Sequence, residues 1–151
     1  QDFQGQFPDT SNAPYTFYSG LQLKSGKRKL LSGKPSDFSA QGRFYCDISA
    51  VRDSFTSKEN LGHVQNLFEL SNIFARGLEN FLNSDEVVSK NDQRVSQVLD
   101  IFTSELRRQQ RLYIRETNYG ENQKVQQKWE NLIQKFQKRD SLGERLEPMD
   151  N

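Results

Sequence analysis

The spacing of hydrophobic and polar positions changes near residue 55, and this change predicts two kinds of secondary structure. Before residue 55, apolar and polar residues alternate over 15–24 and over 43–48, the two-residue period of a half-buried strand. Residues 28–32 follow a Ser-Gly-Lys turn, and we expect them to return as a short antiparallel strand. So small a sheet is stable in water when it packs on the rest of the chain.

After residue 55, apolar residues recur every three or four positions, as on an amphipathic helix. Residues 55–136 contain no proline, so little interrupts this pattern. It predicts three helices, at about 57–82, 85–117 and 121–139. Residues that favour helix ends lie at the boundaries: a capping box at Thr56-Ser57-Lys58-Glu59, acids at Asp85-Glu86, and a stop at Asn118-Tyr119-Gly120.

These elements predict a mainly α chain: an antiparallel three-helix bundle with a small N-terminal β hairpin or sheet packed on it, an α+β arrangement. A chain of 151 residues suits one domain. We divide it into a flexible arm (1–14), a small β or extended region (15–54), the helical bundle (55–140) and a flexible tail (141–151). Trp129 shares an apolar stripe with Val125 and Ile133, so we expect it to anchor the core.

The second predicted helix is longer than the third, so part of its apolar surface needs another cover. The N-terminal sheet is one candidate and a partner chain is another. A heptad pattern along this helix, with Val95, Phe102 and Leu106 among its members, has the same two interpretations. We favour packing within the chain; the alternative is that part of this seam buries another chain's helix or supports oligomerisation.

Charge and composition exclude several function classes. The net charge is +1, so no strong overall attraction to nucleic acid or acidic membranes is expected. No apolar run approaches the ~18 residues of a membrane-spanning helix. With one cysteine and one histidine, the chain has no internal disulfide framework and no Cys/His zinc arrangement, and we expect no cofactor or metal.

Catalytic candidates are few. His63 is the single histidine, and we interpret it as a surface or packed residue rather than a general base. Cys46 alternates with Phe44 and Ile48, which favours a buried structural thiol over a nucleophile. The carboxylates show no pairing pattern, and no phosphate-binding or nucleophile motif occurs. We therefore expect the chain not to be an enzyme.

Two basic clusters are the strongest candidate contact surfaces. The first lies close in the sequence to the aromatic residues Tyr15, Phe17 and Tyr18 and comprises Lys24, Lys27, Arg28, Lys29 and Lys34. It is either a possible nucleic-acid or anion site or simply a solvated hairpin. The second lies near the end of the second predicted helix and comprises Arg107, Arg108, Arg111 and Arg115. Helix-dipole complementation explains one or two of these arginines, and an acidic protein partner explains all four.

The leading hypothesis is a non-enzymatic interaction module, such as an adaptor or assembly factor, that binds an acidic protein through amphipathic helices and the arginine stripe. The alternative is a nucleic-acid-binding protein that uses the basic hairpin. A second alternative, a small secreted helical effector, rests on Gln1 and on the small size. The lone cysteine favours an intracellular protein over a secreted one.

Overall fold

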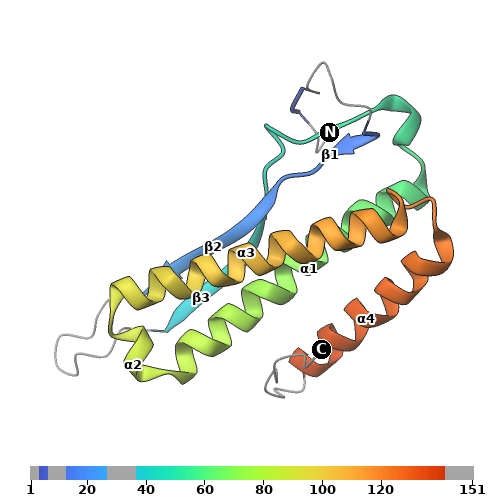
Figure 1. Ribbon diagram of the computed structural model, residues 1–151. Helices are drawn as coiled ribbons and strands as arrows, with labels where there is room; N and C mark the ends of the chain where they lie inside the picture. The colour runs from blue at the N-terminus through green and yellow to red at the C-terminus, as the bar shows by residue number, and fades with distance from the viewer. Residues whose placement is uncertain (1–3, 7–12, 27–36, 142–151) are drawn as a thin grey trace.

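The structure, a computed structural model, describes residues 4–6, 13–26 and 37–141, and it confirms a mainly helical α+β fold (Figure 1). Three long helices form the bundle: α1 (Lys58–Ser84), α3 (Asp92–Thr117) and α4 (Gln123–Ser141). A single turn, α2 (Glu86–Ser89), connects α1 to α3. The predicted first and third helices are therefore confirmed within about two residues at each end.

Two antiparallel strand pairs precede the bundle. The first pairs β1 (Tyr15–Thr16) with β4 (Ala50–Val51). The second pairs β2 (Ser19–Ser25) with β3 (Phe38–Phe44), in register from Ser19 opposite Phe44 to Ser25 opposite Phe38. A 3₁₀ turn, η1 (Asp53–Phe55), leads from β4 into α1.

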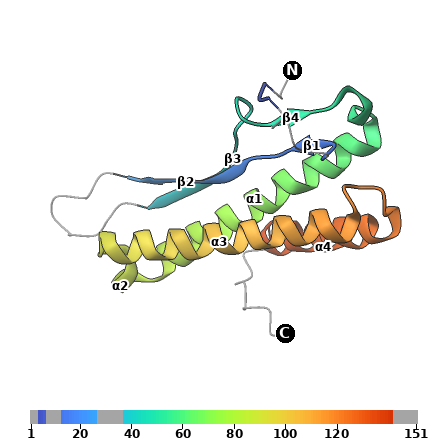
Figure 2. The same ribbon diagram turned by 45° about the horizontal axis from the view of Figure 1, so that its top comes forward.

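The elements form layers around the antiparallel pair α1 and α3. The β2–β3 ribbon lies along one side of this pair, and α4 lies on the other side, as the two views show (Figures 1 and 2). α4 has 19 residues against 27 in α1 and 26 in α3, so it covers only part of their length. The β2–β3 ribbon contacts both longer helices, α1 and α3, and so covers their apolar surface on its side of the bundle.

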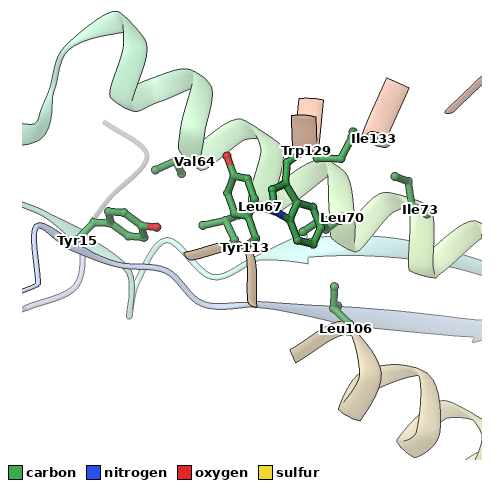
Figure 3. Packing of buried hydrophobic residues seen from close by; sticks show 9 residues of the cluster. All are labelled: Tyr15, Val64, Leu67, Leu70, Ile73, Leu106, Tyr113, Trp129 and Ile133. Carbon is green, nitrogen blue, oxygen red and sulfur yellow. The ribbon is translucent and has the colours of Figure 1, made fainter. Parts of the chain in front are cut away.

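Trp129 is a core residue, as the sequence predicts. Its side chain is 9% exposed, and its ring meets the Tyr113 ring edge-on at a centroid distance of 5.4 Å. Figure 3 shows both rings among the aliphatic side chains of the main cluster. Besides these two rings, the buried members of that cluster are Tyr15, Val64, Leu67, Leu70, Ile73, Leu106 and Ile133.

α1 also completes the free edge of the β2–β3 ribbon. The Asn83 side chain accepts from the Phe38 backbone N–H at 2.8 Å and donates to the Phe38 carbonyl at 2.9 Å. Glu79 accepts from the Ala40 N–H at 2.8 Å. Because these groups pair the backbone that another strand would otherwise bind, this edge of β3 is closed.

The helix ends differ from the expected ones in their details. Ser57 caps α1 by accepting from the Asn60 N–H, so the capping hydroxyl lies one residue later than Thr56.

The predicted second helix, 85–117, is wrong as one element, because the helix is interrupted at Lys90 and Asn91. Asp85 caps α2 from outside it, and the Asn91 side chain caps α3 by accepting from the Arg94 N–H. Two polar caps so close together favour two helix starts.

The predicted stop after α3 is confirmed. Asn118, Tyr119 and Gly120 have φ values of 46°, 56° and 94°, all in the left-handed region. A Cβ on Gly120 would lie 3.1 Å from Cγ of His63, so glycine also permits this turn to approach the histidine closely. The turn sends α4 back antiparallel to α3.

The strand predictions need three corrections. The predicted strand 15–24 is divided into β1 and β2, because Phe17 and Tyr18 lie outside both. The expected strand 43–48 is wrong, since β3 spans 38–44 and Cys46 lies in the following turn, partly exposed. The pattern is misleading because β3 faces α1 partly with small residues: a Cβ on Gly42 would lie 3.0 Å from Ser71. The expected strand 28–32 lies outside the described residues.

The proposed arm and tail also fall largely outside the described part of the chain. Within the arm, the Gln4 N–H donates to the Cys46 carbonyl at 2.7 Å, and the Gly5 N–H donates to the Ser49 carbonyl at 2.8 Å. These bonds place residues 4–5 against the turn that follows β3.

Candidate functional site

The arginine cluster lies on α3, and all four side chains are exposed. Nη1 of Arg108 is 3.2 Å from the Glu105 carboxylate. The guanidinium groups of Arg107, Arg111 and Arg115 make no hydrogen bond or ion pair within the described residues. Arg115 lies in the last turn of α3, where a cation complements the helix dipole. Arg107 and Arg111 lie before the last turn, so the helix dipole does not account for them.

The structure describes one member of the basic hairpin cluster. Lys24 lies on β2 and is exposed, whereas Lys27, Arg28, Lys29 and Lys34 lie outside the described residues. The aromatic residues near this cluster are mostly used in packing. Tyr15 is buried, and Phe17 stacks on Phe44 at a centroid distance of 5.3 Å. Tyr18 is exposed, so one of the three aromatic rings is left for stacking on a base.

His63 is fully buried at the start of the bundle, between the sheet region and α4. Its Nδ1 is 3.2 Å from Oε1 of Gln126, and its Nε2 is 2.7 Å from the Tyr15 hydroxyl. An amide oxygen only accepts, so Nδ1 carries the proton and Nε2 accepts from the tyrosine. The ring also stacks on Tyr113 at 4.6 Å. His63 is therefore a packed histidine, the interpretation that the sequence favours over a general base.

Burial controls the protonation of this cluster. Desolvation lowers the pKa of His63 to about 4, against an opposing effect of its hydrogen bond with Gln126. Desolvation likewise raises the pKa of Tyr15 and of Tyr113 above the usual range of tyrosine. All three groups are neutral near pH 7 and face one another, so they stabilise the fold and offer no open site for a substrate.

A second polar cluster joins β2, α1 and α3. Nε2 of Gln110 is 2.7 Å from the Ser19 hydroxyl and 3.2 Å from both the Ser71 hydroxyl and the Leu67 carbonyl. The two serine hydroxyls are 2.8 Å apart. These residues are interior polar groups that bind each other, and they fix the ribbon on the helices.

An apolar groove, which we call the α4 groove, lies where α4 meets α1 and α3. It has a volume of about 170 Å³. Nearly all of its lining side chains are apolar or aromatic: Leu70, Ile73, Phe74 and Gly77 of α1, Phe102 and Gln109 of α3, and Trp129, Leu132, Ile133 and Phe136 of α4. It forms where the stripe on α4 meets the aromatic residues of the longer helices.

Exposed apolar residues occur at and beyond the groove. Leu132, at its edge, is 37% exposed. Phe81 is 39% exposed, and its ring centroid lies 6.3 Å from that of Phe102, which lines the groove. Ile101, which immediately precedes Phe102 on α3, is 65% exposed. Apolar surface therefore continues from the groove along the part of α1 and α3 that extends towards α2.

The sequence gives a partial signal for this groove. Phe102 belongs to the heptad seam, and Ile101 belongs to its flank, so the hypothesis of a seam open to another chain includes both residues. The pattern does not show that α4 stops short of α2, nor that Leu132 lies at the edge of its stripe while Ile133 is buried. Those facts depend on how the helices cross.

The described residues contain neither a cluster of metal-ligating side chains nor a membrane-spanning helix. Across residues 4–6, 13–26 and 37–141, no three histidine, cysteine or acidic side chains gather where they would hold a metal ion. None of the helices in this part of the chain is long and apolar enough to cross a membrane.

Comparisons of the chain with protein-family models, with curated proteins and with solved structures found no match.

Proposed function

We propose that this chain is a non-enzymatic protein interaction module that binds a partner protein in the α4 groove. The observation that supports this proposal is the open apolar lining of the groove, together with its continuation onto exposed Phe81 and Ile101. A contiguous exposed apolar surface is costly in water and marks an interaction site more often than scattered apolar residues do.

The size and chemistry of the groove favour a protein partner over a small molecule. Small-molecule sites are typically about 300–1,000 Å³ and contain several converging polar groups. The groove has about 170 Å³, and Gln109 is the one amide among its lining side chains. That amide donates to Glu105 at 2.8 Å. Such a surface suits a few apolar side chains of a partner, which dock while the partner's polar groups stay outside.

Site-specific photocrosslinking in an extract of the native source tests this proposal. A photoreactive phenylalanine analogue at Ile101 samples the groove end. The same analogue at Ser96, an exposed position five residues earlier, samples another side of α3. A third variant, at Lys24, samples the ribbon. We expect a discrete protein adduct from position 101 that positions 96 and 24 do not give.

A second variant connects the adduct to the groove. Phe102→Ala removes a ring that lines the groove, and we expect it to abolish the adduct from position 101 in a chain whose circular dichroism is unchanged. Equal adducts from all three positions would contradict the proposal. A nucleic-acid adduct from position 24 would favour the alternative function instead.

A further inference from the structure

Basic side chains border the α4 groove on α4. Lys128 and Lys135 lie four residues before and three residues after Leu132, so all three residues share one side of the helix. Leu132 lines the groove, and both lysines are exposed. Neither ammonium group makes an ion pair within the described residues, so this rim carries two uncompensated positive charges.

The α3 rim carries charges of both signs. Arg108 and Arg115 lie four residues before and three residues after Leu112, which packs against the core. Glu105 pairs with Arg108, and Glu116 accepts from Nε1 of Trp129 at 2.9 Å. The neutral indole N–H leaves the Glu116 carboxylate charged, so the charges of Arg108 and Arg115 are balanced by those of Glu105 and Glu116. The uncompensated positive charge beside the groove therefore lies on the α4 rim.

We propose that the α4 groove binds an amphipathic helix of another protein, with apolar side chains on one face and carboxylates along the edge of that face that lies beside α4. This inference rests on the proposed function and specifies the chemistry of the partner. The groove lies between the antiparallel helices α3 and α4, and its α4 lining spans two turns, from Trp129 to Phe136. A partner helix fits such a groove by docking side chains at i, i+3, i+4 and i+7.

Charge complementarity selects an acidic partner. Carboxylates along one edge of the apolar face meet Lys128 and Lys135 on the α4 rim, and a docked helix would partly shield these opposite charges from water and so strengthen their attraction. A nucleic acid fits this surface poorly. Its phosphates match the α4 rim, but its sugars and base edges would lie on an apolar floor without hydrogen-bond partners. A protein helix satisfies its own backbone groups and avoids this cost.

Binding of defined peptides to the full chain tests the inference. The probe is an amphipathic peptide of about 18 residues, five helical turns, with leucines at helical spacing, glutamates along one edge of the apolar face and no tryptophan. A second peptide has lysine in place of each glutamate. A third has the composition of the first in scrambled order. Trp129 is the single tryptophan and lines the groove, so its emission and its quenching by acrylamide report occupancy.

We expect the acidic amphipathic peptide to bind, to protect Trp129 from acrylamide and to lose affinity as salt is raised. The basic peptide and the scrambled peptide are expected not to bind. The double variant Lys128→Glu and Lys135→Glu is expected to weaken binding at least about tenfold, since each reversal converts an attraction into a repulsion. Both lysines are exposed, so its melting temperature is expected to stay close to that of the original chain.

The matched control is the double variant Lys24→Glu and Arg107→Glu, which changes the net charge equally. Lys24 lies on β2, and Arg107 lies two residues from Gln109, on the opposite side of α3 from the groove. We expect this control to retain binding. Loss of binding in both variants would attribute the effect to net charge and would overturn the inference.

Two further results would overturn the inference without deciding the proposed function. Equal binding of the acidic and basic peptides would show a groove without charge selection. Failure of the acidic peptide to bind would exclude this partner chemistry, while a protein adduct at position 101 would still support an interaction module. If that adduct is a second copy of this chain, the site is a self-association surface and the inference is wrong.

Discussion

The two sides of the α1–α3 pair are covered in different ways. On one side, β2 and β3 pair over seven residues each, and side chains of α1 complete the edge of β3. Polar groups within that interface bind one another, as Gln110 does with Ser19 and Ser71. On the other side, α4 is shorter than the helices it covers, and exposed apolar residues remain beyond the groove.

This difference distinguishes the ribbon interface, which the chain closes with its own residues, from the α4 groove, which it leaves open. Between ribbon and helices, directional hydrogen bonds require a unique arrangement, because an unpaired interior polar group costs about 1–3 kcal/mol. At α4, polar contacts lie near the α3–α4 turn, where Gln126 meets His63 and Asn66 meets Glu130, and again at Gln137, which donates to Glu69 at 2.7 Å. The groove itself has an almost entirely apolar lining, and apolar contacts impose less geometry. A partner helix therefore replaces solvent there without breaking hydrogen bonds within the chain.

The largest expected effect is at Leu78, on the ribbon side of α1. This side chain is fully buried and packs in a cluster with Phe38 and Leu82. Leu78→Ala removes apolar contacts and leaves a cavity, so we expect the free energy of unfolding to fall by about 2–5 kcal/mol. Urea denaturation followed by circular dichroism measures the change. A loss below about 1 kcal/mol would show that the ribbon is not a fixed layer.

The next effect is a pH dependence from His63, which belongs to the α4 side. Its pKa is about 4 in the folded chain and about 6.5 in the unfolded chain. The unfolded chain therefore binds more protons between these values, and stability falls as the pH decreases from about 6.5 to about 4. The full contribution is on the order of 3 kcal/mol.

The variant His63→Gln isolates this contribution from that of the carboxylates. We expect the variant to be less stable at pH 7, because the stacking on Tyr113 is lost. Its stability is also expected to decrease less steeply than that of the original chain between about pH 6.5 and 4. Urea denaturation at several pH values measures both slopes, and parallel slopes would show that His63 titrates freely in the folded chain.

A smaller effect is expected at Gln110, which holds the ribbon to the helices. Gln110→Ala leaves the hydroxyls of Ser19 and Ser71 with fewer partners, and we expect a loss of about 1–3 kcal/mol. The control is Gln41→Ala, which removes an exposed bond to Gln22 and is expected to cost less than about 0.5 kcal/mol. If the two variants lose equal stability, the buried network does not fix the ribbon.

The helices were the most predictable part of the fold, because their signals are local. Leu67, Leu78 and Leu82 of α1 and Ile133 of α4 recur at helical spacing and are all buried, and the left-handed stop at Asn118 follows from residue preference. β3 was less predictable, because its fit against α1 depends on Gly42 being small. Alternating hydrophobicity does not report that kind of contact, and the pattern instead suggested a strand through Cys46.

The candidate site was predictable only in part. The sequence identified the arginines of α3 as a possible contact surface, and all four are exposed. It did not relate them to Lys128 and Lys135, because charges on two helices come together only through the bundle geometry. The partnership of His63 with Tyr15 and Gln126 was hidden for the same reason, since those residues are 48 and 63 positions away in the chain.

The smallest expected effect on stability distinguishes the groove from the core. Leu132 and Ile133 are neighbours on α4, but Leu132 is 37% exposed and Ile133 is 3% exposed. Leu132→Ala is expected to lower the free energy of unfolding by less than about 1 kcal/mol, because much of that side chain already contacts water. Ile133→Ala removes a buried side chain and is expected to cost about 2–5 kcal/mol.

Partner binding is expected to depend on Leu132 although stability does not. Leu132→Ala removes apolar area offered to a docked helix, and we expect it to weaken the binding of the acidic peptide although the chain stays folded. Denaturation and peptide titration of the same samples measure both effects. If Leu132→Ala proves as costly to stability as Ile133→Ala, Leu132 belongs to the closed core and the groove is not an open docking surface.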